Sequence, residues 1–233
     1  MAVLTLNRAA VAVAVALALL LLFFGGSFGW AFIALMLYFL VLAFLVTYLR
    51  LDYKEKRGLT DRVRGVKNVL SNGLAPLAFS IIYYAGGALS NNLLATAGLA
   101  GFLGSVAAIT SDKFSSELGV LDGLPRVIFT MKVTKKGRSG AVTAFGLLMG
   151  ALGAFLVAVV AIPLLGSSII ASGGAGTVGI IAIATASGLL GSVADSMVGY
   201  FEELGIGSKH TSNVIGSVIG GLVCAALVLL VVL

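Results

Sequence analysis

The segment Gly188–Gly199 reads GLLGSVADSMVG and completes an apolar stretch that begins near residue 176. About 20 mostly apolar residues are enough to cross a bilayer as a helix. Small residues recur every three or four positions, so they share one helix face with Asp195, the only charged side chain of the segment. Such faces let neighbouring membrane helices approach closely. The segment therefore predicts a membrane helix that presents one carboxylate on a small-residue face.

The composition of the whole chain also indicates a membrane protein. Of its 233 residues, 60% are hydrophobic and 10% are charged, and the mean hydropathy is +1.14. Soluble domains are about 45–50% apolar and about 25% charged, so an ordinary soluble domain and a disordered chain are both excluded. The apolar segments cover residues 9–24, 28–49, 69–89, 92–110, 141–163, 176–199 and 213–233.

These segments predict an all-α fold, a polytopic membrane helix bundle with about seven transmembrane helices. The first segment follows Arg8 and resembles a signal peptide, but residues 25–29 make a poor cleavage site, so we expect a retained anchor. We divide the chain into an N-terminal two-helix membrane segment, residues 1–50, and a repeat-containing catalytic membrane domain, residues 51–233.

The distribution of charge predicts the orientation. Most of the 15 Lys and Arg residues lie between the second and third and between the fourth and fifth apolar segments, whereas loops 25–27, 90–91 and 164–175 carry no charge. The positive-inside rule places the basic loops and the N-terminus in the cytoplasm of a multi-pass cell-membrane protein. All nine acidic residues lie at or near the same face. We therefore expect any active site to face the cytoplasm, where the net charge of +6 also favours anionic lipid headgroups.

The chain contains a diverged internal repeat. Gly101–Ala107 (GFLGSVA) returns as Gly188–Ala194 (GLLGSVA), and each copy leads to an aspartate, Asp112 or Asp195. Both copies belong to segments predicted to run in the same direction, so the repeat is parallel. Repeats of this kind place binding sites at the interface between the copies. The alternative is a chance likeness between two glycine- and alanine-rich helices.

Three carboxylates near the cytoplasmic helix ends are candidates for chemistry. A carboxylate inside a membrane helix, such as Asp195, is costly and functional by default, although an interfacial side chain that only reaches water is the alternative. Asp112 and Glu117 lie about 140° apart on an ideal helix and cannot share a face unless the helix breaks. Glu117 could instead form a surface ion pair with Lys113 at i, i+4. Carboxylates that converge from repeat-related helices suit Mg²⁺, which binds oxygen ligands together with substrate phosphates.

A basic loop with two glycines, Lys135–Gly140 (KKGRSG), precedes the fifth apolar segment. Glycines free backbone N–H groups, and the helix that follows favours anions at its N-terminus. The loop therefore suits a polyphosphate, and a cluster that only follows the positive-inside rule is the alternative. The third segment opens in a similar way, with Arg64, Lys67, Asn68 and Asn72 as candidates for phosphate binding.

Other chemistries lack the residues they need. One cysteine, Cys224, and one histidine, His210, leave no disulfide framework, Cys-based zinc site or histidine relay. Residues 174–179 satisfy GxGxxG, but they lie on the uncharged side without a βαβ context, so a dinucleotide site is not expected. Nucleic acid is not an expected partner either, because the basic loops lack interleaved aromatic side chains.

Several stretches resemble motifs of one family. In this family a basic residue followed by an asparagine opens a membrane helix, and Arg64–Gly73 resembles this pattern. Ser111–Gly119 resembles the family motif in which an aspartate is followed by a serine and a glutamate. Lys136–Thr143 is similar to its glycine-rich loop, and Gly191–Gly199 resembles its Gly-Ser-x-x-Asp-Ser segment, with Asn213 as its late asparagine. This is the family of phytyl-phosphate kinase and transmembrane protein 19, integral membrane proteins distantly similar to the CTP-dependent phytol and dolichol kinases. The resemblance covers roughly residues 60–233.

The resemblance implies a kinase that transfers a phosphoryl group from a nucleoside triphosphate, with CTP expected, to a prenyl (phytyl or geranylgeranyl) monophosphate, giving the diphosphate. Mg²⁺ is the expected cofactor, and its expected ligands, which are also the expected catalytic residues, are Asp112, Glu117 and Asp195. The expected nucleotide- or phosphate-binding residues are Arg64, Lys67, Asn68, Asn72, Lys135, Lys136, Gly137, Arg138, Ser139, Gly140, Ser196 and Asn213. Lys113 departs from the family motif, which has a threonine after the aspartate.

A secondary transporter of a phosphorylated or lipid metabolite is the main alternative function. Parallel repeats and intramembrane carboxylates suit it as well, but a transporter needs polar residues at mid-membrane and on the outer side. Here the outer loops are free of charge and the acids gather at one face, which favours a one-sided enzyme. The sequence leaves both a monomer and a homo-oligomer open.

Overall fold

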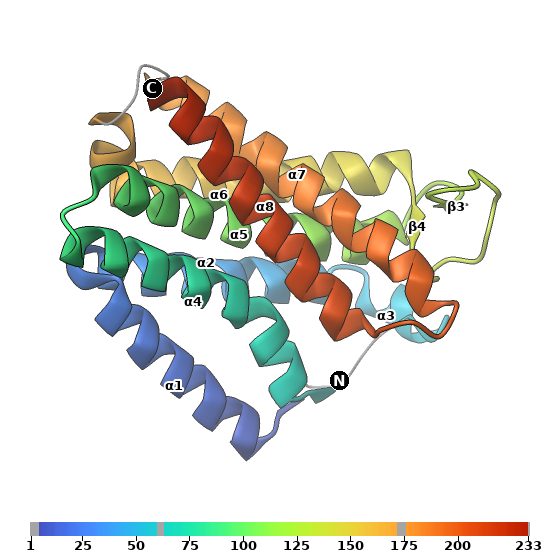
Figure 1. The fold of residues 1–233 in the computed structure, drawn as a ribbon. Helices are drawn as coiled ribbons and strands as arrows, with labels where there is room; N and C mark the ends of the chain where they lie inside the picture. Colours follow the sequence, from blue (N-terminus) through green and yellow to red (C-terminus); the bar gives the residue numbers. More distant parts are fainter. Residues whose placement is uncertain (1–4, 60–62, 172–175, 233) are drawn as a thin grey trace.

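The computed structural model describes residues 5–59, 63–171 and 176–232, and within these the chain is a bundle of helices (Figure 1). The helices are α1 (Arg8–Phe24), α2 (Gly29–Tyr48), α3 (Leu51–Glu55), α4 (Val66–Ala88), α5 (Asn92–Gly119), α6 (Ala144–Ala171), α7 (Gly176–Glu202) and α8 (Lys209–Val232), with a 3₁₀ turn at Gly26–Phe28. Two short strand pairs accompany them: β1 (Thr5–Leu6) lies parallel to β2 (Val63–Arg64), and β3 (Arg126–Val127) lies antiparallel to β4 (Ala141–Val142). The all-α membrane bundle is confirmed.

The number of full-length spans differs from the expected seven. Among the described residues, six helices are long and apolar enough to cross a bilayer, and α1 is a shorter apolar helix of 17 residues. Such a helix measures about 25 Å, less than the hydrocarbon core of about 30 Å. Asn7 caps its start by accepting a hydrogen bond from the Ala10 amide, and Gly25 ends it. The turn at Gly25–Phe28 therefore comes too early for a full span.

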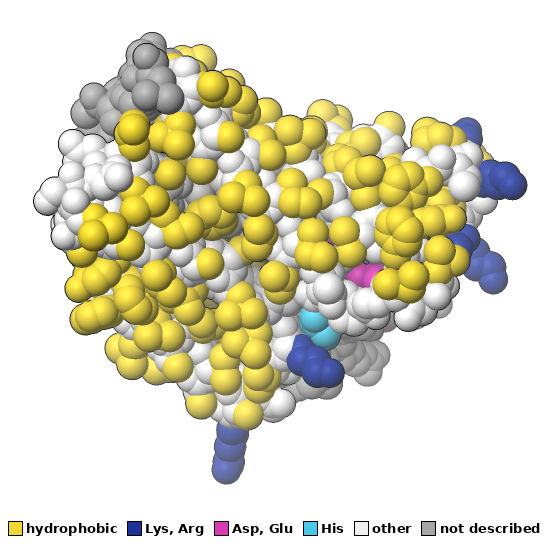
Figure 2. Space-filling view, in the orientation of Figure 1, with side chains coloured by type: hydrophobic (Ala, Val, Ile, Leu, Met, Phe, Trp, Pro, Cys, Tyr) yellow, Lys and Arg dark blue, Asp and Glu magenta, His cyan; other side chains and the backbone are white. Residues whose placement is uncertain are grey.

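Helix α5 lies at the centre of the bundle (Figure 1). It contacts α2, α4, α6, α7 and α8, and its residues from Gly98 to Ser111 are buried without interruption. A helix that is buried on every side needs small or apolar residues all round, and α5 has them. Hydrophobic side chains are spread over much of the visible face (Figure 2), as expected for a bundle in lipid.

The predicted small-residue faces form the helix contacts. Gly191 of α7 and Gly216 of α8 face each other, so that a Cβ on Gly216 would lie 2.7 Å from the Gly191 carbonyl oxygen. A Cβ on Gly188 would lie 2.9 Å from Ala107 of α5. The two repeat copies, Gly101–Ala107 and Gly188–Ala194, therefore lie on helices in direct contact. Both helices end at the same end of the bundle, next to β3 and β4, so their parallel direction agrees with the prediction.

Candidate functional site

A cavity of about 390 Å³ opens at the end of the bundle where α5 and α7 end and where α4 and α8 begin. Loop residues 136–143 close one side of it. Segments distant in the sequence therefore meet at this end. The cavity is lined by most of the residues predicted from the sequence, namely Asn68, Asn72, Asp112, Glu117, Lys136, Gly137, Arg138, Ser139, Gly140, Asp195, Ser196 and Asn213.

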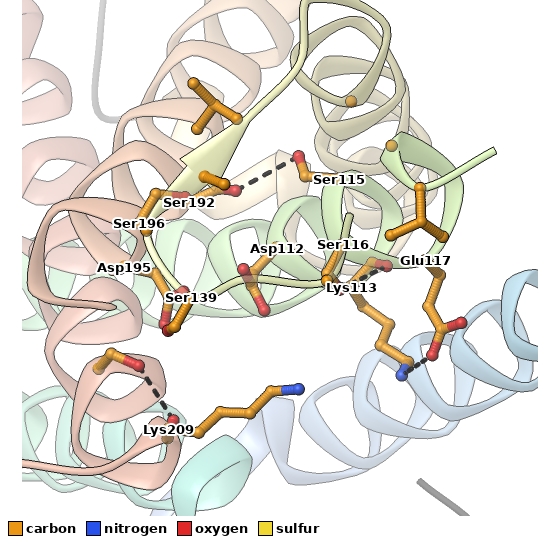
Figure 3. Close-up of a pocket in the computed structure, with 18 of the residues that line it drawn as sticks. Asp112, Lys113, Ser115, Ser116, Glu117, Ser139, Ser192, Asp195, Ser196 and Lys209 are labelled. Atoms are coloured by element: carbon orange, nitrogen blue, oxygen red, sulfur yellow. Dashed lines mark hydrogen bonds and ion pairs between the residues drawn. The ribbon is translucent and has the colours of Figure 1, made fainter. Parts of the chain in front are cut away.

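Asp112 of α5 and Asp195 of α7 point into the same space (Figure 3). The close approach of the two helices explains this, because a Cβ on Gly191 would lie 2.6 Å from the Cβ of Ala108. The two carboxyl groups lie close enough for the charge of each to affect the other. Two facing carboxylates at the edge of a membrane need a positive counter-charge, so the pair is suited to a cation or to a group that brings one.

Helix α8 supplies two further groups to this pair. With its amide oriented to satisfy both neighbours, Asn213 donates from Nδ2 to Asp195 Oδ1 at 3.0 Å and to the Lys209 carbonyl at 2.8 Å. Lys209 extends into the cavity (Figure 3), and its positive charge acts on the Asp112 carboxyl group. The carboxylate pair is therefore faced by an amide donor and a lysine that lie one turn apart on α8.

Glu117 does not join the two aspartates. It accepts hydrogen bonds from Lys54 Nζ at 2.8 Å, from Thr47 Oγ1 at 3.2 Å and from Lys113 Nζ. Helix α5 continues unbroken to Gly119, so Asp112 faces α7 whereas Glu117 faces α2 and α3. Among the described residues, no three His, Cys, Asp or Glu side chains are grouped to hold a metal ion. The expected three-carboxylate group is therefore not formed, and the alternative Lys113–Glu117 pair is.

The basic loop lies against the end of α7. Gly140 adopts a φ of +71°, and a Cβ added at this residue would lie only 2.6 Å from the Tyr200 backbone. Both observations explain why a glycine is needed there. Ser139 donates from its hydroxyl to Glu202 at 2.8 Å and from its amide to Glu203 at 3.3 Å. Arg138 Nε lies 3.4 Å from Glu203 Oε2. The carboxylates of Glu202 and Glu203 thus bind the Ser139 and Arg138 donor groups that would suit a phosphate.

Three predicted phosphate-binding residues are not part of the cavity wall as described. Lys67 and Lys135 are exposed and do not line the cavity. Arg64 belongs to β2, and its side chain lies outside the described residues. Asn68 and Asn72, one turn apart on α4, do line the cavity. The N-terminus of α4 therefore contributes amide groups to the site.

Comparison with known proteins places the chain in a family. The profile described as integral membrane protein DUF92 matches residues 1–220. The chain belongs to the DUF92 family of integral membrane proteins. The matched residues include all of region 1–50 and most of region 51–233. Together with the apolar helices, the match shows that the chain is an integral, multi-pass membrane protein.

Individual relatives of this DUF92 protein include one from an archaeon and two from a plant. It is 38% identical over 197 residues, 84% of this chain and 75% of the relative, to an uncharacterized membrane protein of Methanocaldococcus jannaschii. In Arabidopsis thaliana, Protein VTE6, chloroplastic, is 30% identical over 138 residues, 57% of this chain and 40% of that protein. Protein PGR is 50% identical over 56 residues, 24% of this chain and 19% of that protein. No solved structure matches the chain. These matches confirm the family resemblance that the motifs indicated.

Four charged residues at or next to the cavity of this DUF92 protein were not predicted as site residues from the sequence. Lys209, Lys113 and Glu202 line the cavity, and Lys54 lies behind its wall. The position of Lys209 carried a signal, because it precedes Asn213 by one helical turn. The others carried none, since their roles depend on how α3, α5 and α7 pack together.

Proposed function

We propose that the protein is an integral membrane kinase that transfers a phosphoryl group from a nucleoside triphosphate, with CTP as the expected donor, to a prenyl monophosphate. The observation that carries the proposal is the convergence of an acidic pair, Asp112 and Asp195, with lysines, an arginine and a glycine-containing loop on one cavity. Phosphoryl transfer between two anions needs positioning and charge neutralisation more than covalent help, and this cavity offers both.

The cavity wall has separate groups for each part of the two substrates. Lys113, Lys136 and Lys209 present ammonium groups, and the backbone at Gly137–Gly140 presents N–H groups, which suits the phosphates of the donor and the acceptor. Phe39, Ile109 and Leu147 line the same cavity. Their apolar surface suits the first part of a prenyl chain, whose remainder would lie among lipid tails.

The acidic pair fits Mg²⁺. This ion is usually held by one or two carboxylates together with substrate phosphates and water, rather than by a complete protein cage. Asp112 and Asp195 supply such a pair, and the Asn213 amide holds the Asp195 carboxylate in place. When bound, Mg²⁺ would neutralise charge on the phosphates. The role of Glu117 is then to fix Lys113, with which it forms an ion pair, and not to bind the metal.

The proposed active site faces the cytoplasm, because the cavity lies at the end of the bundle that carries the basic loops. The same observation favours a kinase over a transporter. The charged side chains of the cavity come from the helix ends and loops at this end, whereas the buried polar side chains farther along α5, Ser105 and Thr110, are hydroxyls that donate to carbonyls of their own helix. A transporter would need polar groups along its path through the membrane.

A substrate panel tests the proposal. Purified protein in detergent with Mg²⁺ is incubated with each of the four nucleoside triphosphates and with phytyl, geranyl or geranylgeranyl monophosphate, and prenyl diphosphate is measured by mass spectrometry. Diphosphate formed with at least one pair is the expected result. If no pair gives diphosphate while the protein is folded and monodisperse, the kinase proposal is wrong and the transporter becomes the better hypothesis.

A further inference from the structure

Lys54 is a fully buried lysine next to the site. It lies in α3, its side chain is 0% exposed, and it is among the largest fully buried side chains of the described residues. Its ammonium donates to the Val46 carbonyl at 2.7 Å, to the Thr47 carbonyl at 3.1 Å and to Glu117 Oε2 at 2.8 Å. All three N–H groups of the ammonium are therefore used, in one fixed arrangement.

This arrangement joins two helices that the sequence analysis assigned to different regions. The two carbonyls belong to the last turn of α2, where a positive charge is favourable. Glu117 belongs to the last turns of α5 and is only 16% exposed. A buried ammonium is costly unless it is paired and fully hydrogen-bonded. Lys54 meets that condition only while Glu117 stays where it is, so each of the two residues holds the other.

Glu117 connects Lys54 to the cavity wall. Its second oxygen, Oε1, pairs with Lys113 and accepts a hydrogen bond from Thr47, while Oε2 pairs with Lys54. Lys113 lines the cavity beside Asp112 (Figure 3). We propose that Lys54 is a positioning residue: it fixes the Glu117 carboxylate, and this carboxylate fixes the Lys113 ammonium at the cavity wall, where it binds a substrate phosphate. The inference rests on the proposed kinase function and links the site to α3 and to the last turn of α2.

Loss of Lys54 should therefore weaken substrate binding. Without this anchor, the Glu117 carboxylate keeps only its partners Thr47 and Lys113, so it no longer holds the Lys113 ammonium at one place on the cavity wall. We expect the KM for the nucleotide to rise about tenfold, with a smaller change in kcat, because a phosphate contact present before and during transfer contributes to binding in both states. A residue that only stabilised the fold would lower the amount of active protein and leave KM unchanged.

A double-mutant cycle tests this positioning role. The variants are Lys54→Met, Glu117→Met and the double variant, and the matched control is Lys56→Met, an exposed lysine of the same segment. KM and kcat are measured with the best substrate pair, and the melting temperature is measured in detergent. If Lys54 acts through Glu117, the double variant has the same KM as Glu117→Met, and Lys56→Met has the KM of the wild type.

Each outcome decides between the roles. Single variants leave one buried charge without its partner and can fail to fold, but a buried ion pair replaced by two apolar side chains is often tolerated. If the single variants do not fold, the double variant alone tests the proposal. A raised KM in the double variant supports the positioning role of Lys54, and a wild-type KM overturns that role. KM effects of the two single changes that multiply in the double variant also overturn it. Wild-type protein that forms no diphosphate refutes the proposed function itself, and the positioning role falls with it.

Discussion

Substitution of Gly216 by alanine should disturb the site without removing a polar side chain. Gly216 of α8 lies against α7, and an added Cβ would lie 2.7 Å from the Gly191 carbonyl oxygen and 2.8 Å from the Cβ of Asp195. Ordinary contact begins at 3.4 Å, so the two helices must separate by roughly 0.7–1 Å in a close-packed interior. Asp195 lies on this contact and would move away from Asp112. A displacement of about 1 Å at a reacting group can cost about 10²-fold in rate.

The measurement is kcat for diphosphate formation, together with the melting temperature in detergent. We expect Gly216→Ala to fold, with a stability loss of about 1–3 kcal/mol typical of overpacking, and to lose about 100-fold in kcat. The matched control is Gly87→Ala near the end of α4, where an added Cβ would meet nothing within 4 Å. Wild-type kcat in Gly216→Ala would refute the inference that close approach of α7 and α8 sets the geometry of the acidic pair.

Three further predictions concern the groups around that pair. Asn213→Ala removes the donor to Asp195 Oδ1. Because a hydrogen bond to a charged group contributes about 1.5–3 kcal/mol, we expect kcat/KM, measured by steady-state kinetics, to fall about ten- to 150-fold. Unchanged kinetics would contradict this role of Asn213. Glu203→Gln releases Arg138 from an exposed ion pair, so that Arg138 is free to bind a nucleotide phosphate. The KM for the nucleotide should therefore fall about two- to fivefold at low salt and less at high salt. A higher KM would show instead that Glu203 assists binding. Chelation of Mg²⁺ by EDTA should abolish turnover, and added Mg²⁺ should restore it, whereas full turnover in EDTA would exclude the metal from the Asp112–Asp195 pair.

The helices and their contacts followed closely from the sequence, because a lipid environment imposes strong local requirements. Long apolar segments must be helices, and stripes of glycine and serine must face other helices. The contact between Gly191 and Gly216 and the position of Asp195 beside it are direct consequences of such a stripe. The repeat also indicated that Asp112 and Asp195 would come together. Most predicted site residues therefore line one cavity.

Features that depend on the exact path of a helix or loop could not be predicted from the sequence. The fourth apolar segment was expected to end at residue 110, but α5 continues to Gly119 and turns Glu117 away from the aspartates. The apolar pattern stops earlier than the helix because its last turns pack against polar groups of α2 and α3. Lys54 was indistinguishable from its exposed neighbours, such as Lys56, because one short helix decides which of them is buried.

The transfer of radiolabel from the γ-phosphate of the preferred nucleotide to geranylgeranyl monophosphate tests the role of the acidic pair most directly. Wild-type protein is compared with Asp195→Asn and with Asp122→Asn, which changes an exposed aspartate outside the cavity. We predict labelled diphosphate from the wild type and from Asp122→Asn, and at least about 100-fold less from Asp195→Asn at equal folded protein. Equal labelling by Asp195→Asn and the wild type would contradict the account.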